Sequence, residues 1–402
     1  MHVLIIPSWY PADPQDMGGS FFREQAIAMA RRVEHVGLIF PALRSLKWVY
    51  RSSSVPKGLL YEDDNGVHTY RWGAFNWTPR IPVGIYRQWM MHGMSLFEAY
   101  VQRHGLPDVI HAHCMLFAGA LAVRIKERFG IPVVVTEHST GYGRPFYGKF
   151  EMATAVSVAA QCDALLAVSA NSAEVLQSLF SHGKHPWRVL PNIVNGTFLD
   201  HPLRQLGKQS IFTFINVALL RRVKRQDILI RAFAHAFAQA PDVRLIIAGA
   251  GHERRQLTNL VHELGMDAQV SLVGNVERQS MPALLAEANA FVLSSELETF
   301  GVVLVEALAM GLPVVATKCG GPNEIVRADD GILVPVNDVD ALALAMRKMW
   351  SDADSYDPQH IRSACAERFS ETTVCARLIE TYVAVTTKFV HERTLGSERC
   401  IS

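Results

Sequence analysis

The chain has 402 residues, of which 49% are hydrophobic and 19% are charged, and its formal net charge is +1. This composition is typical of a globular protein, excludes a disordered chain, and gives no global indication of nucleic-acid binding. The length is sufficient for two or three domains with sizeable cores.

The cysteines and the apolar runs predict a protein of the reducing cytoplasm. Six cysteines are scattered without a C-x-x-C pair, so neither a zinc site nor a disulfide framework is expected. The sequence opens directly on an apolar strand pattern, without a basic leader, and contains no apolar run of 18 or more residues. We therefore expect neither a secretory signal nor a membrane span.

The first half of the chain predicts a Rossmann-like domain over residues 1–195. Short apolar strand patterns alternate with helical ones, which is typical of a parallel sheet covered on both faces. The predicted strands are at residues 2–7, 35–40, 108–111, 132–136, 164–168 and 188–190, and the helices at 21–32, 115–129 and 169–180.

Two glycines lie in the loop that follows the first predicted strand. Gly18 and Gly19 come just before the helix at 21–32, where residues without a side chain let a ligand approach the backbone closely. The alternative is that they only form a turn.

Residues 41–103 interrupt the alternation and are rich in aromatic and basic side chains. Lysine and arginine interleaved with tryptophan and tyrosine suit an anionic membrane surface or a lipid-linked phosphate. The alternative is an insertion packed on its own domain; as a group, these residues favour an acceptor or membrane face. They are Arg44, Lys47, Trp48, Tyr50, Arg51, Trp72, Trp77, Arg80, Tyr86, Arg87 and Trp89.

Three histidines follow predicted strands. His138, in the sequence T-E-H, lies at the end of a strand, the edge where parallel sheets bind ligands. His111 and His113 could form a metal pair, but two histidines at i and i+2 without a further ligand set are a weak signal.

The second half predicts a linker at residues 196–210 and a second Rossmann-like domain at 211–375. Glycine and proline interrupt the pattern in the linker, and strand and helix patterns then alternate again. The predicted strands are at residues 212–217, 243–249, 270–274, 291–293 and 313–316, and the helices at 226–237, 253–264 and 281–288. Residues 358–389 predict two further amphipathic helices.

The stretch 294–324, SSELETFGVVLVEALAMGLPVVATKCGGPNE, predicts a ligand site. A strand leads into an acidic turn, and a helix is predicted from Phe300 to Gly311. Ligands bind at this edge of a parallel sheet, and the free N–H groups of a helix start favour a phosphate. Glu298 and Glu306 flank that start; a capping acid and a solvated acid are the alternatives.

This stretch resembles the retaining glycosyltransferases of family 4, also known as glycosyl transferases group 1. The resemblance is carried by E-x7-E, by A-x-A-x-G-x-P-V-V-A-T and by Gly-Gly-x-x-Glu. It implies the GT-B fold, an α/β architecture of two Rossmann-like domains whose parallel sheets face a central cleft. It also implies that residues 376–402 form a helix that crosses back to the N-terminal domain.

The resemblance further implies the site. Glu298 would hold the donor sugar, Glu306 the ribose, and His138 a sugar hydroxyl, with His113 only beside the acceptor. Residues implied at the donor phosphates are Gly18, Gly19, Lys224, Phe300 and Gly301.

One departure concerns the cationic loop near Lys224. Relatives place an arginine on the diphosphate where this chain has Leu219. We hypothesise that Arg221 or Arg222 replaces the lost charge, because a guanidinium can bind a diphosphate through two hydrogen bonds.

The implied reaction is transfer of a sugar from a UDP-, GDP- or ADP-sugar to a hydroxyl of a glycan or lipid-linked saccharide. No cofactor and no metal are expected, since no D-x-D is suitably placed, and the configuration would be retained. Polysaccharide or lipopolysaccharide synthesis at the inner face of a membrane is the expected setting, with no nucleic-acid partner. The alternatives are a nucleotide-sugar epimerase and a binding protein without catalysis.

Overall fold

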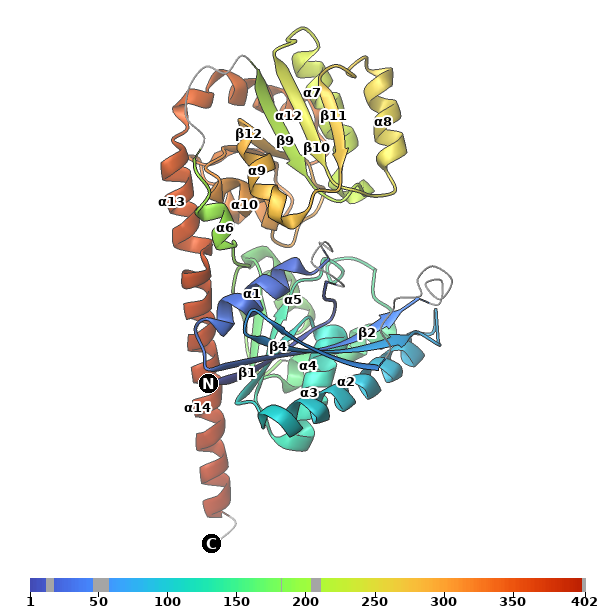
Figure 1. Cartoon of the computed structure of the whole chain (residues 1–402), viewed down its shortest axis with the longest axis vertical. Helices are drawn as coiled ribbons and strands as arrows, with labels where there is room; N and C mark the ends of the chain where they lie inside the picture. Colours follow the sequence, from blue (N-terminus) through green and yellow to red (C-terminus); the bar gives the residue numbers. More distant parts are fainter. Residues whose placement is uncertain (12–17, 46–57, 182, 204–210, 400–402) are drawn as a thin grey trace. The chain divides into compact units, whose positions relative to one another are not determined.

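The computed structural model describes residues 1–11, 18–45, 58–181, 183–203 and 211–399 (Figure 1). The chain forms two compact units: one comprises Met1–Pro191 and Val374–Ser402, the other Asn192–Thr373. In the described part of the chain, none of the helices combines the length and the hydropathy of a membrane-spanning helix.

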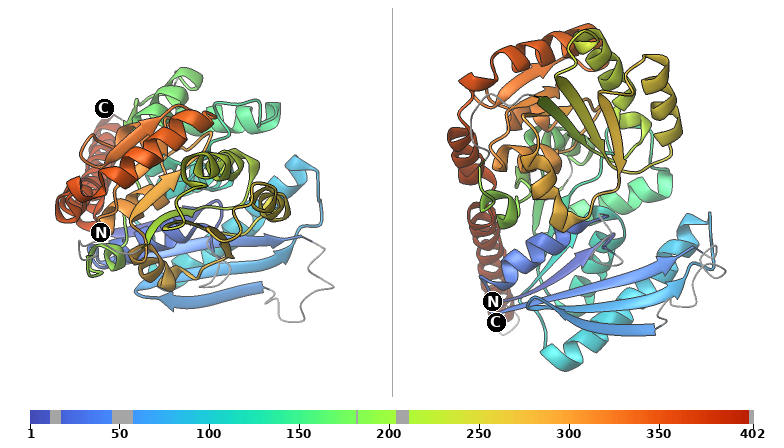
Figure 2. Two further views of the ribbon diagram at one scale, coloured as in Figure 1. Left: turned by 90° about the horizontal axis from the view of Figure 1, so that it is seen from above. Right: turned by 45° about the horizontal axis from the view of Figure 1, so that its top comes forward.

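The first unit is built on an eight-stranded sheet with the order β3-β4-β2-β1-β5-β6-β7-β8. Its strands are β1 His2–Pro7, β2 His35–Arg44, β3 Gly58–Asp64, β4 Val67–Phe75, β5 Val109–His113, β6 Val133–Glu137, β7 Ala164–Ala167 and β8 Trp187–Val189. Neighbouring strands are parallel except for the antiparallel pair β3 and β4. The strands near the N-terminus run side by side in the views of Figure 2.

Helices cover both faces of this sheet, as its apolar central strands require. Helices α2 Pro82–His104, α3 Ala120–Phe129 and α4 Lys149–Gln161 lie together on one face (Figure 1). Leu4 and Ile6 of β1 belong to the core on that face. The unit also contains α1 Ser20–Ala30, the irregular turn η2 Met115–Gly119, and α5 Ala170–Leu179.

The second unit contains a parallel sheet with the order β11-β10-β9-β12-β13-β14. Its strands are β9 Phe212–Val217, β10 Val243–Ala248, β11 Val270–Gly274, β12 Ala290–Leu293, β13 Val314–Thr317 and β14 Gly331–Val334. Its helices include α7 Gln226–Phe237, α8 Arg254–Glu263, α9 Met281–Ala286, α10 Val302–Ala309, α11 Pro322–Ile325, α12 Val339–Ser351 and α13 Pro358–Phe369.

Each sheet has one point at which the strand order reverses. The chain adds strands on one side of β1 and then returns to place β5 on its other side; β9 and β12 have the same relation. Ligands of open parallel sheets bind beside such a point, at the carboxyl ends of the strands. Each unit therefore has one edge where a site is expected.

The segment predicted as a linker is partly ordered within the second unit. Residues Gly196–Leu199 form the short helix α6, capped by the Asn195 side chain, and Phe198 is fully buried. The backbone N–H of Val194 donates to Phe369 O at 2.8 Å. Residues 204–210 of the predicted linker lie outside the described part of the chain.

The C-terminal helix α14, Glu371–Arg399, contributes to both units. Its first residues belong to the second unit, and from Val374 onward it belongs to the first. Tyr382 of this helix is fully buried, and its hydroxyl lies 2.7 Å from Nδ1 of His111 on β5.

Candidate functional site

In the second unit, a lysine and a glutamate meet at the point where the strand order reverses. Lys224 ends the 3-10 turn η3, Arg222–Lys224, which follows β9, and Glu298 follows the neighbouring strand β12. Lys224 Nζ lies 2.5 Å from Glu298 Oε1. Both side chains are mostly buried, with 23% and 12% of their surfaces exposed. The pair brings a cation and an acid to the edge where a ligand is expected.

A serine that the sequence reasoning missed fixes the same carboxylate oxygen. Ser295 Oγ donates to Glu298 Oε1 at 2.6 Å, and the backbone oxygen of Ser295 accepts from Thr317 Oγ1 at 2.6 Å. Ser295 is 2% exposed, so its position is set by the core. Only its place three residues before Glu298 could have indicated this role.

Backbone hydrogen bonds tie together the loops that carry this pair. Glu296 N–H donates to Val223 O at 2.8 Å, and Ser294 Oγ donates to Lys224 O at 2.9 Å. Glu298 itself bridges to Gly320 beside β13. The loops after three neighbouring strands therefore hold Lys224 and Glu298 in one rigid arrangement.

The start of α10 presents backbone N–H groups at the same edge. Gly301 caps the helix with φ +110° and provides no side-chain hydrogen bond, so a ligand can bind the first N–H groups. The helix spans Val302–Ala309, shorter at both ends than the predicted 300–311. The Phe300 side chain is 4% exposed and packs on Phe369, so only its backbone can meet a ligand.

Glu306 is not solvated, which excludes one of the two alternatives for it. Its side chain is 2% exposed, and Oε1 lies 2.6 Å from Arg278 Nη1. Arg278 begins the turn η4, Arg278–Ser280, after β11, and its guanidinium lies 4.8 Å from the centre of the Phe198 ring. The need for a partner could be predicted from the apolar helix; that the partner is Arg278 could not.

The two arginines predicted to replace the missing charge adjoin Lys224. Arg221 is extended and Arg222 opens η3; both are exposed, and neither forms an ion pair within the described residues. Leu219, at the position of the family arginine, is 47% exposed. Both guanidiniums are thus available to a ligand near Lys224.

In the first unit, Phe22 of α1, the helix that follows the glycine loop, packs on two histidines. Gly19 precedes α1 with φ +85°, and Gly18 beside it is exposed. His113 ends β5 and His138 follows β6, and Nδ1 of His113 lies 3.1 Å from Nε2 of His138. The Phe22 ring lies 4.7 Å from the His113 ring and 4.9 Å from the His138 ring.

Burial keeps these histidines neutral at physiological pH. It lowers the pKa of His138 to about 3 and that of His111 to about 3, and it also lowers the pKa of His113. His138 can therefore act as a neutral hydrogen-bonding group and cannot contribute a positive charge.

His111 has a structural role, and the metal-pair interpretation of His111 and His113 is not supported. Both His111 ring nitrogens are engaged, Nε2 with Thr136 Oγ1 at 2.8 Å and Nδ1 with the Tyr382 hydroxyl. Within the described residues, no group of three or more His, Cys, Asp or Glu side chains is placed to hold a metal.

Glu137 is a further residue that the sequence reasoning missed. It is fully buried and accepts backbone hydrogen bonds from Met115 at 2.8 Å, His138 at 2.9 Å and Ser139 at 2.8 Å. Burial raises the pKa of this carboxyl. Glu137 thereby fixes the turn that carries His138.

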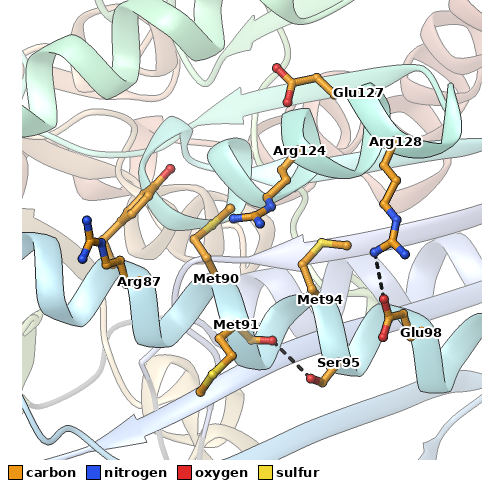
Figure 3. A pocket seen from close by; sticks show the side chains of 10 residues that line it. Arg87, Met90, Met91, Met94, Ser95, Glu98, Arg124, Glu127 and Arg128 are labelled. Carbon is orange, nitrogen blue, oxygen red and sulfur yellow. Dashed lines mark hydrogen bonds and ion pairs between the residues drawn. The ribbon is translucent and has the colours of Figure 1, made fainter.

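A separate groove of about 620 Å³ lies between α2 and α3. Figure 3 shows Met90 and Met94 rising from α2 toward Arg124 and Arg128 of α3. Arg128 pairs with Glu98 at 3.0 Å at one end. At the other end Arg87 and Arg124 are exposed, and neither forms an ion pair within the described residues.

The aromatic residues near this groove correct part of the interpretation of residues 41–103. Trp89 is 3% exposed and belongs to the core, and Trp72 is half-buried and stacks on His92. Trp77, in contrast, is 70% exposed. Lys47, Trp48, Tyr50 and Arg51 lie outside the described residues. Packing on the domain thus accounts for Trp89 and Trp72.

Known protein families match both halves of the chain. The model of the glycosyl transferases group 1 matches residues 204–364, and that of Glycosyltransferase Family 4 matches residues 56–197. A glycogen synthase of Mycobacterium tuberculosis is 28% identical over 302 residues, which are 73% of this chain and 72% of that protein.

Solved structures share the fold. Sucrose-phosphate synthase from Thermosynechococcus elongatus superimposes with a TM-score of 0.79 at 20% identity, covering 96% of this chain and 100% of that one. HepE of Anabaena in complex with UDP gives a TM-score of 0.69 at 20% identity, with the same coverage. The predicted fold class, two α/β units with parallel sheets, is confirmed. Because the two family models together span most of both units, the chain belongs to glycosyltransferase family 4 and is a glycosyltransferase.

Proposed function

We propose that this protein transfers a sugar from a nucleotide diphosphate sugar to a hydroxyl of a glycan or lipid-linked saccharide, with retained configuration and without a metal. The observation that carries the proposal is the Lys224–Glu298 pair, which precedes the start of α10, where the cap Gly301 provides no side-chain hydrogen bond. A cation and free N–H groups suit a diphosphate, and the acid suits sugar hydroxyls.

The diphosphate becomes more negative as the bond to the sugar breaks. Lys224, Arg221 and Arg222 on one loop and the N–H groups after Gly301 are the groups that would stabilise this charge. In the proposed step, the bond between the anomeric carbon and the diphosphate oxygen breaks. The acceptor oxygen forms the new bond on the same face, and its proton passes to the departing phosphate.

Glu298 would orient the donor sugar. Its Oε1 atom is engaged by Lys224 and Ser295, whereas Oε2 has no hydrogen-bond partner among the described residues. A carboxylate held at one oxygen accepts hydrogen bonds from sugar hydroxyls at the other. Orienting the donor in this way contributes to catalysis by positioning.

In the first unit, His138 and the glycine loop are the proposed ligands of the sugar and the acceptor. His138 is buried and neutral, so it suits an uncharged hydroxyl. Gly18 and Gly19 lack side chains that would obstruct the backbone N–H groups of their loop.

For the acceptor, the groove between α2 and α3 favours a partner with an anionic group and apolar chains. Arg87 and Arg124 supply cations at one end, and Met90 and Met94 supply an adaptable apolar surface. We therefore propose a lipid-linked acceptor, as in polysaccharide or lipopolysaccharide synthesis, with the protein bound peripherally at the cytoplasmic face of a membrane.

The experiment that tests the function is incubation with labelled UDP-, GDP- and ADP-sugars. A transferase is expected to hydrolyse one donor slowly when no acceptor is present and to form product when an acceptor is added. Interconversion of two donor sugars without acceptor would instead establish an epimerase. If the protein neither hydrolyses nor transfers the sugar of any of these donors, the proposal is contradicted.

A further inference from the structure

We propose that Arg278 is the positioning residue for Glu306 and thereby sets the selectivity of this protein for ribose over deoxyribose in its nucleotide. The inference rests on the proposed function, in which Glu306 holds the ribose. Its starting observation is the 2.6 Å contact between Arg278 Nη1 and Glu306 Oε1.

Three separate segments converge on this contact. Arg278 lies in the turn after β11, Glu306 lies in α10 after β12, and Phe198 lies in α6. The Arg278 guanidinium lies over the Phe198 ring at 4.8 Å, and Phe198 is 1% exposed. The arginine is therefore fixed on one side by a buried aromatic ring and on another by the carboxylate.

The placement along the sheet connects this pair with the donor site. Glu306 is in the second turn of α10, the helix that begins at Val302, four residues after Glu298, the partner of Lys224. Four residues of helix correspond to about 6 Å, roughly the separation between a diphosphate at the helix start and the adjoining ribose. Arg278, in the turn after β11, contacts Glu306 in this second turn of α10.

Charge and burial explain why Glu306 needs Arg278. Glu306 is 2% exposed in a helix of otherwise apolar residues, so an unpaired carboxylate there would be strongly unfavourable. An arginine remains charged, and its planar fork fixes the direction of the carboxylate better than a lysine ammonium does. The contact with the arginine is made at Oε1, and a carboxylate can accept about four hydrogen bonds, so one carboxylate can bind an arginine and a ribose hydroxyl together.

The contact between Arg278 and Glu306 could serve stability alone or could also position Glu306 for the ribose. The selectivity of nucleotide binding distinguishes these two roles. A structural pair affects stability and leaves the preference between ribose and deoxyribose unchanged. A positioning residue affects that preference specifically, because a misdirected carboxylate accepts the ribose hydroxyl poorly.

The experiment measures, by calorimetry, the affinities of UDP, GDP and ADP and of their 2′-deoxy and 3′-deoxy forms. Lys224 and the helix start should contribute equally to each pair, because all the probes carry the same diphosphate. The wild-type protein is expected to bind the ribose form of its preferred nucleotide at least about tenfold more tightly than one of the deoxy forms, since a hydrogen bond to a charged group is lost.

Arg278→Lys keeps a positive charge beside Glu306 and loses only the planar fork of the guanidinium. We expect it to reduce the ratio of the affinity for the ribose form to that for the deoxy form to within about threefold. The affinity for the deoxy forms should remain nearly unchanged. Glu306→Gln is expected to abolish the ratio. The matched control is Arg347→Lys, because Arg347 lies in the same unit and donates to two backbone oxygens of α7, His235 O at 2.7 Å and Ala236 O at 3.2 Å. Circular dichroism and a thermal melt establish that each variant is folded.

The outcomes separate the two claims. One outcome overturns the inference: the wild type prefers the ribose form, Glu306→Gln loses this preference, and folded Arg278→Lys keeps it. Arg278 is then only a structural partner of Glu306. If the wild type shows no ratio at all, the assignment of Glu306 to the ribose fails, and the inference fails with it. Loss of the ratio in both variants, but not in the Arg347 control, supports the inference.

Discussion

Lys224 and Glu298 form an ion pair of 2.5 Å between the loops that follow two neighbouring strands, β9 and β12. The pair lies at the point where the strand order of the second unit reverses. In the proposed function the lysine binds the diphosphate and the glutamate binds the sugar. Their contact therefore keeps two groups with different ligands in a fixed relation.

Ser295 is expected to matter for transfer more than for nucleotide binding. Ser295→Ala removes the 2.6 Å hydrogen bond to Glu298 Oε1 and leaves Lys224 in place. We expect the transfer rate to fall about tenfold, the equivalent of one hydrogen bond, with the affinity for the nucleoside diphosphate within about twofold of the wild type. Steady-state kinetics and calorimetry measure the two quantities. Ser351→Ala on α12 is the control, and an equal loss of both quantities in Ser295→Ala would indicate a structural role.

The arginines beside Lys224 are expected to contribute to donor binding. Arg221→Ala and Arg222→Ala each remove an exposed guanidinium from the cationic loop. We expect at least one of them to weaken nucleoside diphosphate binding by about tenfold, because a charge-assisted hydrogen bond to phosphate is lost. Raising the salt concentration should reduce the difference. Unchanged affinity in both variants would contradict a role of these arginines at the diphosphate.

The buried histidines predict how stability depends on pH. Burial lowers the pKa of both His111 and His138 to about 3, compared with 6.5 in the unfolded chain. Between these values the unfolded chain binds more protons than the folded one, so the free energy of unfolding falls as the pH decreases below about 6.5. Glu137, whose pKa is raised by burial, acts in the opposite direction.

Chemical denaturation at pH 7 and at pH 5 measures this effect. Each buried histidine contributes up to about 1.4 kcal/mol per pH unit to the slope of the free energy of unfolding against pH. A folded His138→Gln variant should show a shallower slope, since it has one such group fewer. An identical slope in that variant would show that His138 does not titrate in this way.

The groove between α2 and α3 predicts binding to anionic membranes. Arg87→Gln with Arg124→Gln removes two groove cations that form no ion pair within the described part of the chain. Each arginine near a membrane surface contributes about 1 kcal/mol. We expect the double variant to bind anionic phospholipid vesicles about tenfold or more weakly in a sedimentation assay. Arg128→Gln is the control, because Arg128 pairs with Glu98. No binding of the wild-type protein to anionic vesicles would exclude a membrane role for the groove.

Much of the fold could be predicted because local sequence patterns report it. Short apolar strands alternating with helices predicted most strands of both sheets, although not β4 or β14. The strand that leads to Glu298 is buried as its sequence indicates. The exposed edge strand β3 was not predicted, because its residues are mostly polar or exposed and lack a buried alternating face. Trp89 was assigned to a surface group by composition, whereas the helical period of α2 places it in the core.

The candidate site could be predicted only where a motif names its residues. Glu298, Glu306 and Lys224 lie in segments with recognisable spacing, and His138 follows a predicted strand. Arg278 and Ser295 could not be identified, because their roles arise from contacts between loops that the fold brings together. No local pattern records which loop reaches which helix.

The central claim is that Glu298 acts on the donor sugar beside a lysine that binds the diphosphate. The most direct measurement compares Glu298→Gln with the wild type in sugar transfer and in binding of the nucleoside diphosphate. The account predicts that the variant loses transfer by about 100-fold or more, since a group needed for positioning and charge is removed, and retains nucleotide binding within a few fold. Transfer at the wild-type rate, or the loss of transfer and nucleotide binding together, would contradict it.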